Sequence, residues 1–192
     1  MSYLSFSGSD RPGSINRRAV SLVLNAMRDQ GLAINECELE SLKLPLYTQV
    51  IELADGYPAA LRTLRAQLAE AQGLIIGCPE YNGLITPLLL NALTWLSRSE
   101  SAEPDLSCFR LKPVLICSSS PGGLGGIRAA AELANYLRGI GGLIFPEFFI
   151  VPQGFSVFAE STLGEDHAMV QRATQLAQAF NQFSCTRSAD EA

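Results

Sequence analysis

The chain has 192 residues, of which 47% are hydrophobic, so one domain with a substantial core is expected over residues 1–192. The formal net charge of −5 argues against a nucleic-acid partner, because such proteins need a basic face to neutralise phosphates. No apolar stretch approaches the ~20 residues that span a bilayer, and no leader pattern opens the chain. These features predict a cytoplasmic protein without a membrane segment.

The five cysteines are scattered and include no CxxC pair. This favours reduced, mostly buried thiols over a disulfide framework or a zinc site. The only histidine, His167, lies near the start of a polar C-terminal helix, where a solvated role is expected. A catalytic triad with histidine as its base is therefore not predicted.

Apolar runs alternate with amphipathic stretches along the whole chain, and no linker or repeat interrupts them. Strands are predicted at residues 3–7, 33–39, 73–78, 113–118 and 143–151. Helices are predicted at residues 15–27, 58–71, 88–98, 126–140 and 159–183, and Gly31 is expected to stop the first. The run at 73–78 is apolar throughout, as expected of a central strand buried on both faces. The pattern predicts an α/β fold with a parallel sheet.

Three further segments carry structural expectations. A loop is predicted at residues 43–50, and a frayed polar tail from about residue 185. The helix at 88–98 is apolar nearly all round. It therefore needs a cover besides its own sheet, such as a second subunit.

In a doubly wound sheet the ligand lies outside the carboxyl ends of the strands, so the loops after strands one, three and four are candidates. The first loop, residues 8–16, reads GSDRPGSIN and opens a helix. Its backbone N–H groups and the helix dipole can hold a phosphate, and Arg11 can add a charged fork. An ordinary turn capped by Ser14 uses the same residue types. The loop matches neither the Walker nor the GxGxxG pattern.

The second loop, residues 79–83, reads PEYNG and can offer an apolar edge and backbone hydrogen bonds to a flat ring system. A simple β-turn with Asn82 and Gly83 at its corner explains it as well. The third loop, residues 118–126, carries four glycines, and a ligand can lie directly on their backbone amides. A flexible connection between the strand and the helix explains these glycines equally well. The convergence of the three loops on one sheet edge favours a shared ligand site.

The GSxRxxSxN loop, the PEYN turn with its Pro-x-x-x-Asn-Ala-x-x-Trp helix, and the SxSPGGxGG loop resemble the NADPH-dependent FMN reductase family. That family includes quinone, azo-dye and chromate reductases, and the resemblance covers about Ser5 to Val151. It implies a flavodoxin-like three-layer sandwich, with a five-stranded parallel sheet of order 2-1-3-4-5 and helices on both faces. It also implies bound FMN, NADPH or NADH as the reductant, and a homodimer or homotetramer.

The resemblance further implies a cofactor site. Its residues are Ser9, Arg11, Ser14 and Asn16 for the phosphate, Pro79, Glu80, Tyr81 and Asn82 along the ribityl chain and ring, and Ser120, Gly122, Gly123 and Gly125 on the other side. No catalytic acid or base is required, because the flavin supplies the redox chemistry. Leu90 and Thr94 replace a lysine and an aspartate common in the family, which removes charged contacts expected at a subunit interface.

The resulting hypothesis is an enzyme that transfers hydride from NAD(P)H through FMN to small acceptors such as quinones. The alternatives are a flavodoxin-type electron carrier without NAD(P)H activity, and a flavin-free binding protein. A phosphoacceptor domain on the same fold is disfavoured, because Cys78 and Pro79 stand at the end of the central strand in place of an aspartate.

Overall fold

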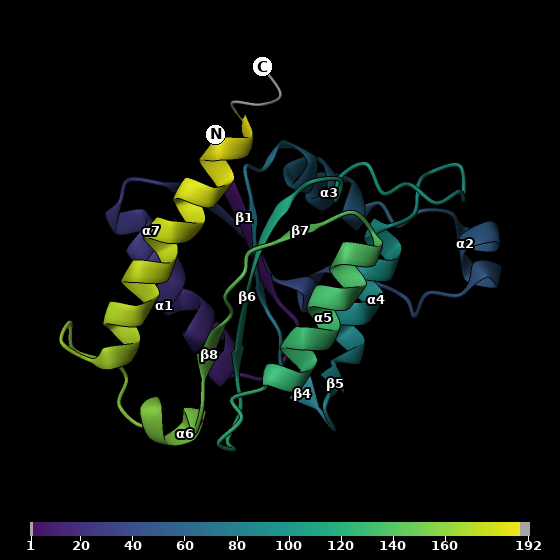
Figure 1. Cartoon of the computed structure of the whole chain (residues 1–192). Helices are drawn as coiled ribbons and strands as arrows, with labels where there is room; N and C mark the ends of the chain where they lie inside the picture. Colours follow the sequence, from purple (N-terminus) through teal and green to yellow (C-terminus); the bar gives the residue numbers. More distant parts are fainter. Residues whose placement is uncertain (1, 189–192) are drawn as a thin grey trace.

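The computed structural model describes residues 2–188 as three layers, with a parallel sheet between two groups of helices (Figure 1). The strands are β1 (Ser2–Ser7), β2 (Ala33–Cys37), β3 (Leu74–Gly77), β4 (Glu80–Tyr81), β5 (Leu84–Ile85), β6 (Pro113–Ser119), β7 (Leu143–Ile144) and β8 (Phe149–Val151). The helices are α1 (Ile15–Asp29), the 3-10 helix η1 (Leu39–Leu42), α2 (Gln49–Asp55), α3 (Ala60–Glu70), α4 (Pro87–Leu96), α5 (Ile127–Gly139), α6 (Gly154–Val157) and α7 (Ala168–Ser188). Within residues 2–188, none of the helices meets the length and apolarity that a bilayer crossing demands.

The main sheet follows the order β2-β1-β3-β6-β7, with β8 also paired to β6, and all these pairs are parallel. This is the order 2-1-3-4-5 of the predicted strands, so the flavodoxin-like α/β prediction is confirmed. Ser7 lies opposite Gly77, and Gly77 lies opposite Cys117. The carboxyl ends of β1, β3 and β6 are therefore level, and the three candidate loops leave the sheet side by side.

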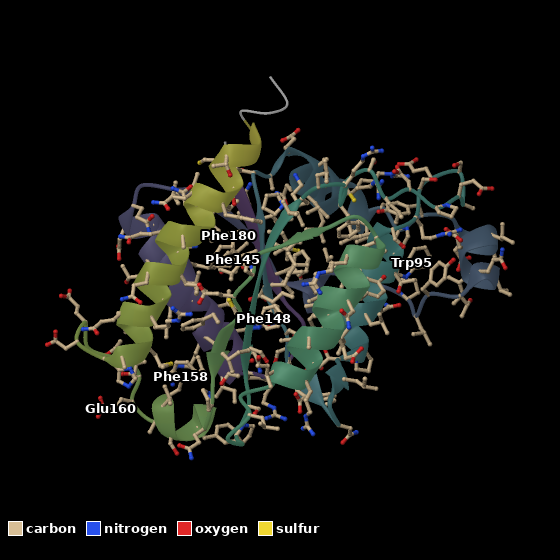
Figure 2. The ribbon with its side chains drawn as sticks, in the orientation of Figure 1. Trp95, Phe145, Phe148, Phe158, Glu160 and Phe180 are labelled. Atoms are coloured by element: carbon tan, nitrogen blue, oxygen red, sulfur yellow. The ribbon has the colours of Figure 1, made fainter. Side chains whose placement is uncertain are left out.

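Each face of the sheet has its own apolar core. On one face the sheet packs against α1 and α7, where Phe145 and Phe180 meet edge to face with ring centroids 5.7 Å apart (Figure 2). On the other face it packs against α3, α4 and α5, and Trp95 is the largest fully buried side chain there. Helix α1 ends just before Gly31, whose φ of 77° confirms the predicted stop.

The structure divides the predicted fifth strand into β7 and β8. The prediction of one continuous strand over residues 143–151 is therefore wrong. The two pieces pair with different ends of β6, with Leu143 opposite Pro113 and Phe149 opposite Cys117. Pro146 lies between them and has no N–H to donate to a ladder. The place of this segment at the sheet edge is as predicted.

The C-terminal helix begins later than predicted, because residues 159–167 form a loop after α6 and α7 begins only at Ala168. His167 precedes the first helical residue, and its Nδ1 accepts a hydrogen bond from the Met169 N–H at 3.1 Å. The side chain therefore caps the helix while it remains partly exposed to solvent.

The end of α7 is also more regular than predicted. The helix continues through Ser188, whereas the sequence predicts a frayed tail from about residue 185. Residues 189–192 of that predicted tail lie outside the described residues.

Helix α4 has a cover besides its own sheet, as predicted, and part of that cover comes from the chain itself. Trp95 Nε1 and Asn91 Nδ2 both donate to the carbonyl oxygen of Pro45, at 2.8 and 2.9 Å. The Tyr47 ring stands edge-on to Trp95 at a centroid distance of 5.1 Å. The segment between η1 and α3, which we call the α4 cover (residues 43–59), thus shields this helix from solvent.

A short helix within the α4 cover is fastened by a buried ion pair. Helix α2 takes up the end of the predicted 43–50 loop, and its Glu52 is 1% exposed. The Glu52 carboxylate accepts hydrogen bonds from Arg98 Nε at 2.8 Å and Nη2 at 3.0 Å, and from the Tyr47 hydroxyl at 3.0 Å. A seven-residue helix is marginal alone, so these tertiary contacts account for its formation.

Candidate functional site

The first loop runs from β1 to the N-terminus of α1, and its start is fixed by contacts from two helices. The Thr86 hydroxyl donates to the carbonyl of Gly8 at 2.8 Å. Arg17 donates from Nε and Nη2 to the carbonyl of Ser9, at 3.1 and 3.0 Å. The loop therefore has a defined shape without any ligand contact.

The loop delivers the N-terminus of α1 to the carboxyl edge of the sheet. Ser14 is the N-cap, and its Oγ accepts a hydrogen bond from the Arg17 N–H at 3.3 Å. The other N–H groups of the first turn have no acceptor within the helix, and the helix dipole adds partial positive charge there. Arg11 is exposed, and within the described part of the chain its guanidinium has no ion-pair partner. This end can therefore receive an anion.

Asn16 joins the first loop to the third. Its Nδ2 donates to the carbonyl of Ser119 at 2.8 Å, and its Oδ1 accepts from the Ser119 N–H at 2.9 Å. Both residues are buried. The side-chain amide thus pairs with both backbone groups of Ser119, as a residue on a neighbouring strand would. This pairing holds the two loops at a fixed separation.

The second loop is the tight hairpin between β4 and β5. Asn82 and Gly83 occupy its corner with φ of 55° and 85°, which is the two-residue turn that asparagine and glycine favour. Glu80, at the start of the hairpin, is hydrogen-bonded to Arg128 Nε at 3.0 Å and to the Ala129 N–H at 3.3 Å. The hairpin is therefore anchored to the N-terminus of α5.

The Glu80 carboxylate is ionised and committed to these contacts. Burial alone would raise its pKa, but the hydrogen bonds from Arg128 and the Ala129 N–H and the Arg128 charge outweigh burial and hold the pKa below its ordinary value. This agrees with a role that is not general base catalysis.

The glycines of the third loop divide into two kinds. A Cβ on Gly125 would lie 2.4 Å from Ile150 Cγ2, and one on Gly126 would lie 2.1 Å from Ser118 Oγ. Around Gly122 and Gly123 the space is open, with Ser120 Oγ at 4.0 Å from the first and nothing within 4 Å of the second. Gly125 and Gly126 therefore let the loop pack on the sheet, while Gly122 and Gly123 leave bare backbone.

We expect alanine substitutions to separate the two kinds. Gly125→Ala should lower the free energy of unfolding by about 2–4 kcal/mol, because its φ is +60° and the methyl group has no space. Gly122→Ala should change it by less than about 0.5 kcal/mol. Urea unfolding followed by circular dichroism measures both. Equal losses would contradict this division of the loop.

The loops enclose one pocket of about 260 Å³ at the carboxyl edge of the sheet. The predicted residues that line it are Ser9, Arg11, Ser14, Asn16, Pro79, Glu80, Tyr81 and Ser120. Those outside its lining are Asn82, at the hairpin corner, and Gly122, Gly123 and Gly125, farther along the third loop. The structure thus brings together one polar end, at the first loop, and one end with proline and tyrosine.

Phe155 also lines this pocket and is absent from the predicted set. It belongs to α6, directly after β8, so a fourth loop reaches the same edge. The signal available in the sequence is positional, because every parallel strand ends at that edge, including the fifth.

The cysteines near the pocket are not nucleophiles. Cys78, Cys108 and Cys117 are buried, Cys37 is half-buried and Cys185 is exposed. Burial raises the pKa of Cys78 to about 12, and it also raises the pKa of Cys117. Both thiols therefore stay protonated at neutral pH.

Comparison with known proteins identifies the family. The model of the NADPH-dependent FMN reductases matches residues 1–156, which include every predicted site residue. The chain belongs to this family. It is accordingly an FMN-dependent NAD(P)H oxidoreductase, as the resemblance of the three loops predicts.

Individual relatives agree with this assignment. The chain is 34% identical over 170 residues to a quinone reductase of Escherichia coli K12, with 83% of this chain and 85% of that protein covered. It is 33% identical over 134 residues to an NAD(P)H-dependent FMN reductase of Pseudomonas aeruginosa, with 70% and 68% covered.

Solved structures share the fold at low identity. The flavoenzyme NAD(P)H:(acceptor) oxidoreductase FerB of Paracoccus denitrificans superposes with a TM-score of 0.74 at 20% identity, covering 96% of this chain and 97% of that one. An archaeal flavodoxin gives a TM-score of 0.57 at 12% identity, covering 96% and 99%. At these identities the likeness shows the flavodoxin-like fold alone.

Proposed function

We propose that this chain transfers electrons from NAD(P)H to quinones or similar flat acceptors, through FMN bound in the pocket between its loops. The observation that carries the proposal is the make-up of that pocket. An unpaired arginine and a helix N-terminus lie at one end, and a proline- and tyrosine-bearing turn lies at the other. A phosphate joined to a flat ring system matches both ends, and the quinone reductase relative supports the acceptor class.

Each residue of the first loop has its own part in this proposal. Arg11 binds the phosphate by charge, and Ser9 offers its hydroxyl. Asn16 acts through its backbone N–H group, because both polar atoms of its side chain already bind Ser119. Ser14 Oγ accepts from the Arg17 N–H and keeps its own O–H to donate to the phosphate. The phosphate then replaces water as the acceptor for the open helix terminus.

The other loops serve the ribityl chain and the ring. Pro79, Glu80 and Tyr81 lie along one side, with Asn82 at the hairpin corner beyond them and the Glu80 carboxylate fixing the hairpin on Arg128. Ser120 lines the opposite side, Gly122 and Gly123 offer open backbone next to it, and Gly125 packs that loop on the sheet. When bound, FMN accepts hydride from NAD(P)H and passes the electrons on, so the protein supplies binding and orientation without a catalytic acid or base.

The proposal includes a cytoplasmic homodimer or homotetramer, as the family resemblance implies. Exposed apolar side chains on α4 and its cover offer a surface for such contacts, namely Leu46, Val50, Leu53 and Leu90. Thr94 stands where the family pattern commonly has an aspartate. Its hydroxyl donates a hydrogen bond to the Leu90 carbonyl at 2.8 Å and makes no charged contact. Light scattering at micromolar concentration measures the assembly, and a monomer mass would contradict this part.

Visible spectroscopy on the purified protein tests the activity directly. We expect a yellow protein, or one that becomes yellow with added FMN, which bleaches with NADPH under anaerobic conditions. A quinone added next should restore the colour in equimolar amount. A yellow protein that NADPH does not bleach would favour an electron carrier, and a protein that takes up no FMN would favour a flavin-free binding protein.

Arg11→Ala is expected to weaken FMN binding by about 1–3 kcal/mol, because a charge-assisted contact with the phosphate is lost. Its free energy of unfolding should stay within about 0.5 kcal/mol of the parent. Ser14→Ala should weaken FMN binding too, and should also lower the free energy of unfolding by about 1 kcal/mol, because it removes the α1 cap.

Fluorescence titration of FMN measures the binding, and the surface variant Arg172→Ala is the matched control. Among the described residues Arg172 forms an ion pair with Glu147 alone, on the surface, so its removal should leave FMN affinity unchanged. Parent affinity in Arg11→Ala would contradict the phosphate assignment of the first loop.

A further inference from the structure

Phe155 combines exposure with a fixed position. Its side chain is 57% exposed, although it belongs to a short helix whose neighbour Phe158 is buried in the α1–α7 core. It lines the same pocket as Arg11 and Ser14. A large apolar ring thus belongs to the lining of the proposed FMN site, together with the first loop.

The third loop holds α6 from one side. The Gly154 N–H donates to the Ser120 carbonyl at 2.9 Å, and the Gln153 N–H donates to the Gly122 carbonyl at 3.0 Å. These bonds place the start of α6 against the loop that lines the pocket. The position of residue 155 is therefore set by backbone contacts to the site itself.

Helix α1 holds the end of α6 from the other side. Arg18 donates hydrogen bonds to the carbonyls of Phe158, Glu160 and Ser161, the last at 3.0 Å. Its guanidinium also lies over the Phe158 ring, 4.7 Å from the centroid, and Figure 2 shows Phe158 and Glu160 on this stretch beside α6. The helix is thus fastened at both ends while the Phe155 ring is left free.

Gly154 brings this fastened helix close to the phosphate end of the pocket. A Cβ at this position would lie 2.2 Å from Ser119 Oγ and 2.8 Å from Ile15 Cδ1. Ile15 is the first residue of α1. Only glycine allows this approach, and the next residue is Phe155.

We propose that Phe155 covers the phosphate end of bound FMN, shields the contact between the phosphate and Arg11 from water, and slows cofactor release. The inference rests on the proposed function and deepens it. Charge interactions strengthen where water is excluded, and salt screens them less. An apolar cover beside an arginine and a helix N-terminus therefore lengthens the lifetime of a bound phosphate without adding a hydrogen bond.

The rate of FMN release from the loaded protein tests this inference. Phe155→Ala should release FMN about tenfold faster, a change of the size expected when an apolar contact of this kind is lost. The rate should also rise more steeply with salt than in the parent. Riboflavin, which has no phosphate, should be released with a change of less than about twofold.

Two further variants keep the test specific. Phe155→Leu retains an apolar cover and should stay within about threefold of the parent rate. Leu106→Ala removes another exposed apolar side chain, which does not line this pocket, and it should have no effect. Thermal unfolding of each apoprotein shows whether a faster release reflects a loss of stability. We expect no such loss, because the Phe155 side chain is largely exposed.

The possible failures can be told apart. A parent protein that takes up no FMN would overturn both the proposed function and this inference. A parent that binds FMN, with an unchanged release rate in Phe155→Ala, would overturn this inference alone. Equal acceleration for FMN and riboflavin, or an unaltered salt dependence, would also overturn it, because the ring would then act elsewhere than at the phosphate.

Discussion

Glu52→Ala is expected to lower the free energy of unfolding by about 3–5 kcal/mol, because it leaves the partly buried Arg98 cation without its carboxylate. Glu52 is 1% exposed and accepts hydrogen bonds from both Arg98 and the Tyr47 hydroxyl. Urea unfolding measures the loss. The double variant Glu52→Leu/Arg98→Leu should recover most of it, since a buried ion pair can be replaced by apolar side chains at little cost.

The same pair predicts a dependence on pH. The hydrogen bond from Arg98 is the largest cause that lowers the pKa of Glu52 from its ordinary 4.5, while burial opposes it and the Tyr47 hydroxyl assists. The unfolded chain therefore takes up this proton at a higher pH than the folded protein. The stability from the pair is fully present above about pH 4.5 and is lost as the pH falls further, so Glu52→Ala should show a shallower acid dependence. Parallel pH curves, or a loss below 1 kcal/mol in Glu52→Ala, would contradict this account.

Asn16→Ala is expected to lower the free energy of unfolding by about 2–4 kcal/mol and to weaken FMN binding more than Arg11→Ala does. It leaves the N–H and the carbonyl of Ser119 buried without partners, and it releases the third loop from the first. Urea unfolding measures the first effect, and FMN titration at a temperature where the variant is folded measures the second.

Asn25→Ala is the matched control, because Asn25 lies exposed on the same helix and its side chain accepts a hydrogen bond from the exposed Arg28. It should change stability by less than about 0.5 kcal/mol and leave FMN affinity alone. If Asn16→Ala lowered stability while FMN affinity stayed at the parent value, the loop separation would not matter for the cofactor.

Much of the fold could be predicted because its strands are short apolar runs with clear ends. The central strand β3 lies between Gly73 and Cys78, and nothing else in that stretch competes with a buried strand. The break between β7 and β8 could not be predicted, since apolar residues stand on both sides of Pro146 and only pairing with β6 reveals it. Helix α2 was missed for a related reason, because it depends on the distant Arg98.

The sequence predicts which loops form the candidate site, but it predicts less well what each side chain does there. Composition and strand order bring the first, second and third loops together. Composition does not tell which polar groups are already occupied, and here the Asn16 amide and the Glu80 carboxylate bind Ser119 and Arg128. Phe155 could not be found from an apolar pattern, because its neighbour Phe158 is buried while Phe155 is exposed.

The α4 cover has a practical consequence for spectroscopy. Trp95 is the only tryptophan of the chain, and its indole is hydrogen-bonded to Pro45 and flanked edge-on by Tyr47 and Tyr57. Intrinsic emission excited at the indole band therefore reports on this one patch. During denaturation, a red shift of the tryptophan emission that precedes the loss of circular dichroism would show that residues 43–59 detach before the sheet unfolds.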